Sequence, residues 1–159
     1  MGKKDDKTNV MRLLDAKKLP YEHFSYDGGA LDAVSVAEQL GQDPACVFKT
    51  LVTSGASGGH YVFVIPGPKE LDLKKAARAA GEKSIAMLPQ RELLALTGYV
   101  HGGCSPIGMK KPFPTFIDAS AEALPAICIS AGRVGRQVKL SLAALRSMLE
   151  LPSAELTKE

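Results

Sequence analysis

The sequence predicts an α+β fold in which helices surround a mixed and strongly curved β-sheet. Helical and strand patterns follow one another without the regular alternation that a parallel βαβ sheet requires. The chain has 159 residues, 45% of them hydrophobic, and shows neither an internal repeat nor a domain linker. A chain of this length and composition suits a single domain with its own core.

We expect this domain to span residues 8–150. Residues 1–7 are polar and are expected to form a mobile N-terminal tail, and residues 151–159 a C-terminal tail. The N-terminus lacks the apolar core of a secretion signal, and no apolar run approaches the length of a membrane span. These features favour a cytoplasmic protein.

The first part of the chain begins with helix and strand signals. Thr8 is a suitable N-cap for a first helix, and residues 21–26 alternate as in a strand. Ser35 opens a capping box, which predicts a short helix that starts there and ends at Gly41.

A hairpin and a further helix are expected next. The apolar, β-branched runs 47–53 and 60–65 flank a loop rich in Gly and Ser, which predicts a hairpin with a long connection. Asp72 is placed to cap a helix that stops at Gly81, and residues 84–88 read as a short strand.

The last part of the chain continues the mixed pattern. Residues 89–96 are predicted to be helical. Short strands are expected at 115–118, 126–129 and 138–140, and Ser141 is placed to cap a final amphipathic helix.

The segment between the fourth predicted helix and the strand at 115–118 is unusually rich in glycine. Residues 101–108 contain three glycines and one proline between apolar neighbours. Such a loop can align backbone N–H groups into a nest for an anion or a developing oxyanion. The alternative is a tight turn between a helix and a strand, which the glycines alone favour.

Two polar side chains interrupt apolar strands. Lys49 lies in the run 47–52, where a buried ammonium needs an anion or a hydrated cavity. An edge strand from which Lys49 reaches solvent would explain it equally well. Tyr26 ends its strand, and its hydroxyl either faces a cleft or closes the core.

Other chemistry-bearing residues give weaker signals. The three histidines have no metal-ligand spacing, and the three cysteines, odd in number and without a CxxC motif, indicate reduced thiols and no structural zinc. Cys104 lies in the glycine-rich loop without an evident base, so a small buried residue is the simpler interpretation.

The charge of the chain is mildly basic. Lysine and arginine exceed the acidic residues by 20 − 17 = 3, which is compatible with a nucleic-acid ligand. The basic residues around the predicted helix at 72–80 form either a solvated face or a footprint for phosphates: Lys69, Lys74, Lys75, Arg78 and Lys83. Tryptophan is absent and aromatic residues make up 6%, which argues against a base-stacking platform.

Taken together, five segments resemble the YbaK family, which includes free-standing Cys-tRNA(Pro) deacylases and is similar to the editing insertion of bacterial prolyl-tRNA synthetases. They are residues 47–51, 71–75, 97–108, 114–118 and 130–133. The segments occur in the family's order and extend the resemblance over about residues 8–150. The GG-x-SP-x-G motif preceded by Lys-Thr-Leu is the specific part.

The resemblance implies a fold and a task. The fold would be a mixed sheet curved into a barrel-like core wrapped by helices. The task would be trans-editing, in which the ester of mischarged Cys-tRNA(Pro) is cleaved beside prolyl-tRNA synthetase, as a lyase or a hydrolase. We expect no cofactor and no metal, and we expect a monomer or a weak dimer.

The resemblance also assigns site residues by position. The catalytic group would be Lys49 with the backbone of Gly102 and Gly103 at the substrate carbonyl. The substrate-binding group would be Tyr26, Ser105, Pro106, Ser130, Ala131 and Gly132. The family often has an acid where this chain has Gln137, which leaves any acid-dependent role at that position open.

The resemblance suggests that the thiol of the cysteinyl ester attacks its own carbonyl and leaves as a thiolactone. Two alternatives stay open at this point. One is a broader deacylase that uses water and also acts on Ala- or Ser-charged tRNA. The other is an accessory of prolyl-tRNA synthetase that binds tRNA or nucleotides without turnover.

Overall fold

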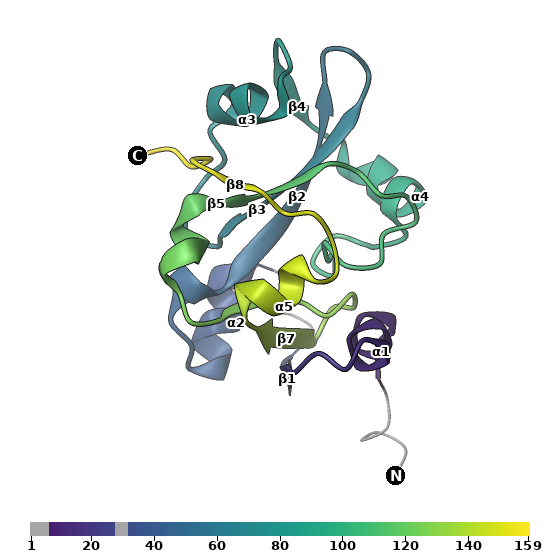
Figure 1. Ribbon diagram of the computed structural model, residues 1–159, viewed down its shortest axis with the longest axis vertical. Coiled ribbons are helices and arrows are strands. Elements are labelled where there is room, and N and C mark those ends of the chain that lie inside the picture. Colours follow the sequence, from purple (N-terminus) through teal and green to yellow (C-terminus); the bar gives the residue numbers. More distant parts are fainter. Residues whose placement is uncertain (1–6, 28–31) are drawn as a thin grey trace.

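The computed structural model describes residues 7–27 and 32–159. Within these residues the chain forms five α-helices, three short 3-10 helices and eight strands (Figure 1). The helices are α1 (Asn9–Ala16), α2 (Ala33–Leu40), α3 (Leu73–Ala80), α4 (Leu93–Thr97) and α5 (Leu142–Arg146), and the 3-10 helices are Pro44–Cys46, Gln90–Glu92 and Ala119–Ala123.

The strands form two sheets. A three-stranded sheet has the order β1-β7-β6, and a five-stranded sheet has the order β4-β2-β3-β5-β8. Their bounds are β1 (Glu22–Ser25), β2 (Phe48–Gly55), β3 (His60–Pro66), β4 (Ile85–Met87), β5 (Thr115–Asp118), β6 (Ile127–Ser130), β7 (Arg136–Leu140) and β8 (Ser153–Ala154).

The predicted α+β class with a mixed sheet is confirmed, because β5 pairs in parallel with both β3 and β8 whereas the other strand pairs are antiparallel. The expected barrel-like single sheet is not what forms. Across the described residues the two sheets are joined by an isolated parallel bridge between Val47 and Cys128, and no barrel closes.

The main core fills the space between the sheets. Val62 and Val64 of β3 pack there with Ile129 of β6, Val138 of β7 and Leu14 of α1, all of them buried. The other face of β3 contributes Phe63 and Ile65 to a second cluster under α3. Strand β3 is therefore buried on both faces, which explains why its sequence is a continuous apolar run.

Local sequence signals account for most helix starts. Thr8, Asp72 and Ser141 cap α1, α3 and α5 as predicted, each by accepting hydrogen bonds from backbone N–H groups of the first turn. The predicted N-cap of the second helix was wrong by three residues. The N-cap of α2 is Asp32, whose carboxylate accepts from the backbone and the hydroxyl of Ser35. A carboxylate three residues upstream thus takes the capping role expected of Ser35.

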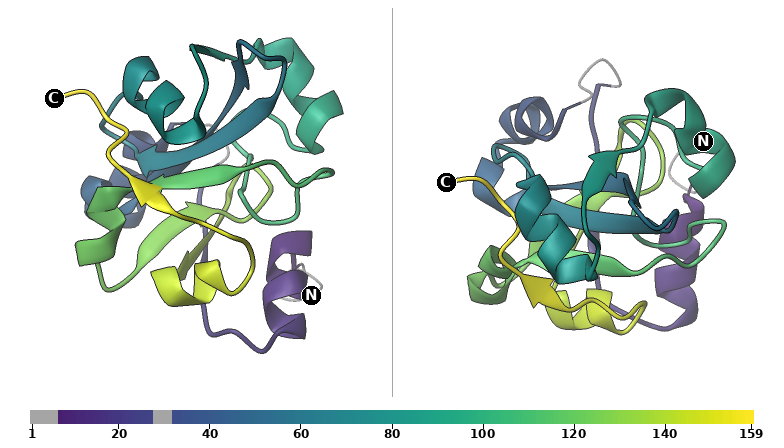
Figure 2. Two further views of the ribbon diagram at one scale, coloured as in Figure 1. Left: turned by 45° about the horizontal axis from the view of Figure 1, so that its top comes forward. Right: turned by 90° about the horizontal axis from the view of Figure 1, so that it is seen from above.

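The C-terminal segment 151–159 is not a tail. Strand β8 runs in parallel beside β5 (Figure 2), Leu151 and Leu156 are buried, and the backbone N–H of Leu156 donates to Asp118. Two apolar residues in a short polar segment are too weak a periodic signal to predict a strand. Of the expected N-terminal tail, residues 1–6 lie outside the described residues.

Helices α1 and α5 lie beside the three-stranded sheet at one end of the molecule, and α3 with β4 forms the opposite end (Figure 1). None of the described helices has both the length and the apolar character needed to cross a bilayer.

Leu156→Ala should test whether the C-terminal segment belongs to the domain. Because the side chain of Leu156 is fully buried, its truncation should lower the free energy of unfolding by about 2–5 kcal/mol. Urea unfolding followed by circular dichroism measures this. The matched control Leu94→Ala removes the same atoms from an exposed leucine and should cost less than about 0.5 kcal/mol. Equal costs for both variants would contradict the packing of this segment.

Candidate functional site

A cavity of about 340 Å³ opens where β2 and β6 diverge beyond the bridge between Val47 and Cys128. It is bounded by the first half of β2, the end of β6, the start of α2 and the glycine-rich loop. Its lining is mainly apolar, and the polar side chains that line it are Tyr26, Asp32, Lys49, Thr50, His101, Ser130 and Gln137. An apolar cavity with few convergent polar groups is typical of a small-ligand or substrate site.

Lys49 lies in this cavity rather than on a solvated edge. Its ammonium donates a hydrogen bond of 2.9 Å to the carbonyl oxygen of Gly67. Burial lowers the pKa of Lys49, while the carboxylates of Glu70 and Asp32 act in the opposite direction. The direct partner is thus a neutral carbonyl, which leaves the charge of Lys49 available to an anion or a polarised oxygen.

Gly67 reaches Lys49 because it has no side chain. A Cβ at this position would lie 2.5 Å from the Cβ of Ala33 and 3.1 Å from the carbonyl oxygen of Val47. The Gly67 N–H in turn donates to that carbonyl at 2.8 Å. Close contact with α2 and with the residue before β2 therefore positions the acceptor for Lys49.

The two glycines of the predicted oxyanion nest have different roles. Residues 100–103 form a turn in which Gly103 N–H donates to Val100 O at 2.9 Å. Gly102 has a φ of +87° whereas His101 does not have a positive φ, which is typical of a type II turn. The amide of Gly103 is thus used by the turn. No hydrogen bond joins the Gly102 amide to another described residue, and Gly102 lines the cavity.

Gly103 lies where the glycine-rich loop contacts the loop after β6. A Cβ there would lie 2.9 Å from the backbone nitrogen of Val134 and 3.1 Å from the carbonyl carbon of Arg133. The turn that carries Gly102 is therefore packed directly on the backbone of the loop after β6. The structure places Gly103 behind the lining of the cavity, as a spacer rather than as a donor.

Of the segment 130–132, at the end of β6 and in the loop that follows it, one residue lines the cavity. Ser130 lines the cavity, and its hydroxyl accepts from the backbone N–H of Gly132 at 3.1 Å. Ala131 is fully buried and donates its N–H to Arg136. Gly132 has a φ of +93° and faces Val10 and Tyr99 of the core. Ala131 and Gly132 therefore support the conformation of this loop without lining the cavity.

Ser105 and Pro106 also lie away from the cavity lining. The hydroxyl of Ser105 is buried and accepts from the backbone N–H of Ile107 at 3.2 Å. Pro106 borders a separate groove on the far side of the loop, together with Met109 and Phe113. Both residues thus fix the course of the glycine-rich loop.

Tyr26 directs its partly buried ring to the cavity from the end of β1. Burial raises the pKa of its hydroxyl, and a backbone contact with Gly135 opposes that shift. The backbone N–H of Tyr26 donates to Gly135 O at 2.9 Å. A protonated phenol at this position can donate a hydrogen bond to a substrate oxygen.

A pair of side-chain amides, of which Gln137 lines the cavity, is not evident from the sequence. Gln137 is 2% exposed, and its side chain exchanges hydrogen bonds of 2.8 and 3.0 Å with that of Gln42. Since the two residues are 95 positions apart, no local pattern could reveal the pair. It presents an uncharged wall where the resemblance leads one to expect an acid.

Cys104 lines the cavity as a thiol. Burial raises its pKa to about 12, and the nucleophile of a cysteine is the thiolate. Among the described residues, no group of three or more His, Cys, Asp or Glu side chains could hold a metal ion. The polar groups of this cavity can thus bind and polarise an ester, but they do not include a prepared nucleophile.

Comparisons with known proteins give a family match over most of the chain. Residues 27–148 match the model of the aminoacyl-tRNA editing domain. EbsC of Enterococcus faecalis, named as a proposed Cys-tRNA(Pro)/Cys-tRNA(Cys) deacylase, is 48% identical over 157 residues, which are 98% of this chain and 96% of EbsC.

Two further similarities are more distant. A proline–tRNA ligase of Shouchella clausii is 30% identical over 99 residues, which are 62% of this chain but 17% of the ligase. The crystal structure of a proposed trans-editing enzyme for prolyl-tRNA synthetase superposes with a TM-score of 0.82 at 23% identity, covering 94% of this chain and 97% of that one. The latter supports the fold.

Gly103→Ala tests whether the close contact at Gly103 excludes a side chain, by comparison with an alanine placed in a loop that has room for it. Its Cβ would meet backbone atoms at 2.9 and 3.1 Å, so overpacking should lower the free energy of unfolding by about 1–3 kcal/mol. In the control Gly59→Ala the nearest atom is the Tyr61 hydroxyl oxygen at 3.5 Å, and the change should stay within about 0.5 kcal/mol. Chemical unfolding of both variants decides between them, and an unchanged Gly103→Ala protein would refute the close contact.

Proposed function

Because this chain belongs to the aminoacyl-tRNA editing domain family, we propose that it is a trans-editing deacylase that removes cysteine from mischarged tRNA(Pro). Its substrate class is aminoacyl-tRNA, and the bond cleaved is the ester between the amino acid and the terminal ribose. The observation that carries the proposal is that Lys49 and Gly102, whose amide is not used by another described residue, line the same cavity.

The Gly102 amide would stabilise the charge that develops on the ester carbonyl oxygen. A preorganised backbone donor costs no reorganisation when the charge appears, and removal of such a donor typically raises a barrier by about 3–4 kcal/mol. Lys49 would place a positive charge at the ester oxygen or at the phosphate of the terminal adenosine. Tyr26 and Ser130 would contact the remaining polar atoms of the substrate.

The substrate thiol would be the nucleophile. Its sulfur forms a bond to the carbonyl carbon, the bond from that carbon to the ribose oxygen breaks, and the thiol proton ends on the ribose oxygen. The products are free tRNA and a cysteine thiolactone, with no change of oxidation state. The neutral Cys104 thiol supports this route, because the cavity then offers proximity and polarisation rather than a nucleophile of its own.

We also infer a working partnership with prolyl-tRNA synthetase. The chain is similar to segments of two proline–tRNA ligases, and its net charge of +3 is modest for an RNA-binding protein. Weak binding of tRNA by the free protein would make help from the synthetase useful. We propose a monomer or weak dimer that works in the cytoplasm, where this substrate is made.

A deacylation panel tests the proposed function. Release of the amino acid from Cys-, Ala-, Ser- and Pro-tRNA(Pro) is measured with and without the protein, and with and without the synthetase. Attack by the substrate thiol predicts rapid loss of cysteine and sparing of serine, in which an oxygen replaces the sulfur. Cleavage of the Ala or Ser ester would instead indicate attack by water and a broader specificity. Ester loss no faster than in the protein-free control would reduce the protein to a tRNA-binding accessory.

Lys49→Ala should lower kcat/KM for Cys-tRNA(Pro) by at least about 10²-fold, on the scale of losing one oxyanion donor. Cys104→Ala is the matched lining variant, and it should change kcat/KM by less than about tenfold because only packing changes. Both are measured in the same deacylation assay, with circular dichroism as a check of folding. Wild-type activity of Lys49→Ala would defeat the assignment, and loss of activity in Cys104→Ala alone would make that thiol the nucleophile.

The pH dependence should report the ionisation of Lys49. Its pKa lies below the usual range because of burial, and activity needs the protonated form, so enzymatic ester loss should fall as the pH rises through that pKa. The Glu70 carboxylate raises the pKa of Lys49, so Glu70→Gln should move this alkaline limb to lower pH. Initial rates corrected for spontaneous hydrolysis measure the limb. The control Glu150→Gln lies in the separate groove beside Pro106 and should leave the alkaline limb in place. If Glu70→Gln does not move the limb, a group other than Lys49 titrates there.

A further inference from the structure

A second cavity, of about 620 Å³, adjoins the first. Lys49 and Leu51 of β2 line both of them, so the two cavities meet at the catalytic lysine. From there the second cavity extends along the start of α3, where Leu73 and Lys74 line it, and past Met87 of β4. We call this second cavity the α3 groove.

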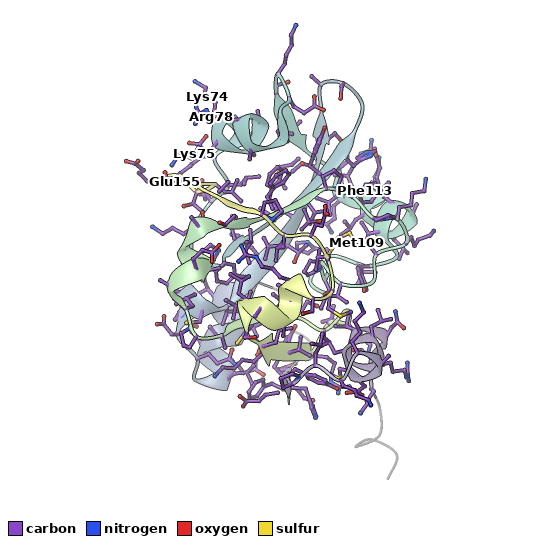
Figure 3. The ribbon with its side chains drawn as sticks, in the orientation of Figure 1. Lys74, Lys75, Arg78, Met109, Phe113 and Glu155 are labelled. Carbon is purple, nitrogen blue, oxygen red and sulfur yellow. The ribbon has the colours of Figure 1, made fainter. Side chains whose placement is uncertain are left out.

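The α3 groove combines cations with exposed apolar side chains. Lys74 lies in its lining, and Arg78 follows one turn later on the same helix face. Figure 3 shows both side chains extending outward from α3. Leu73 and Met87 remain 40% and 46% exposed beside them. Exposed apolar surface next to fixed positive charge suits a nucleotide, which has an apolar base face and an anionic phosphate.

The acidic groups of the groove are already engaged. The Asp72 carboxylate accepts from the backbone N–H groups of Lys74 and Lys75 as the N-cap of α3. Glu70 forms an ion pair of 3.2 Å with Lys158. Lys74 and Arg78 form no salt bridge with another described residue. These two side chains therefore carry positive charge that the described part of the chain does not neutralise.

Lys75 differs from its neighbours on α3. Its ammonium donates to the carbonyl oxygen of Thr157 at 2.8 Å, which ties the helix to the C-terminal segment. Figure 3 places Glu155 on the same side. The cationic surface that faces a ligand is thus the edge formed by Lys74 and Arg78.

We propose that the α3 groove holds the unpaired 3′ strand of the tRNA that leads to the terminal adenosine. This inference rests on the proposed function, because the ester bound at Lys49 is attached to that terminal ribose. The strand must leave the first cavity through a neighbouring channel, and the α3 groove begins at the same lysine. Phosphates of the strand lie over Lys74 and Arg78, and a base lies against Leu73 and Met87.

Removal of the two charges tests the groove. In Lys74→Gln/Arg78→Gln, the Kd for unacylated tRNA(Pro) should rise on the order of tenfold at moderate salt. The slope of log Kd against log salt should fall by roughly 1.4, about 0.7 for each lost contact to a single strand. KM for Cys-tRNA(Pro) should rise in parallel while kcat stays near the wild-type value, since neither residue lies in the first cavity.

Two controls make the result specific. Arg12→Gln/Lys18→Gln removes the same charge from exposed residues in and just after α1, at the other end of the molecule (Figure 1), and it should keep the wild-type Kd and slope. An acceptor-stem RNA without the unpaired 3′ nucleotides should bind the wild type and Lys74→Gln/Arg78→Gln equally.

Three outcomes would overturn the proposal. The first is a wild-type Kd and slope for Lys74→Gln/Arg78→Gln, and the second is an equal loss of affinity in the α1 control. The third is an equal loss of affinity of Lys74→Gln/Arg78→Gln for the acceptor-stem RNA that lacks the unpaired 3′ nucleotides. Failure of the groove is distinguishable from failure of the proposed function. If the wild-type protein releases cysteine and Lys74→Gln/Arg78→Gln does so with unchanged KM, only the groove is refuted. If the wild type does not accelerate ester loss, the deacylase function fails.

Discussion

The bridge between Val47 and Cys128 is the contact on which the site depends. It is where the described parts of the two sheets are joined, and the strands diverge immediately beyond it. The carbonyl of the same Val47 accepts the N–H of Gly67, and the carbonyl of Gly67 accepts the ammonium of Lys49. One residue thus sets both the opening of the cavity and the position of its cation.

The cavity provides polarisation more than reactivity. A partly buried lysine, a backbone amide left over by a type II turn and a partly buried phenol can bind an ester and stabilise charge on its oxygen. The nearby thiol is held in its neutral form by burial. Such a site suits a substrate that brings its own nucleophile, and the uncharged wall formed by Gln42 and Gln137 adds no acid or base to it. In the proposed reaction, proximity within the substrate would supply much of what a catalytic residue otherwise would.

Two features link the site to the rest of the molecule. Gly103 packs the turn of Gly102 on the backbone at Arg133 and Val134, so that the two loops are in direct contact. On the other side, β2 places Lys49 at the junction of two cavities, and α3 borders the second of them. The same strand therefore lines the candidate site and the α3 groove.

The sequence by itself determined the local structure. The Asp72 cap, the hairpin of β2 and β3, and a lysine placed among apolar strand residues follow from interactions between near neighbours. Where signals competed or were short, sequence reasoning failed. Asp32 took the cap expected of Ser35, and the segment containing Leu151 and Leu156 proved to be part of the core.

Only the tertiary structure decided which candidates share the cavity. The amide of Gly103 is hydrogen-bonded within the turn whereas that of Gly102 is not, and this difference depends on backbone angles that the Gly-Gly sequence does not determine. The pairing of Gln42 with Gln137 spans 95 positions, and the divergence of the sheets after Val47 depends on strand pairing between distant segments. Contacts between residues far apart in the chain leave no periodic trace in the sequence, because each partner is chosen by packing rather than by its neighbours.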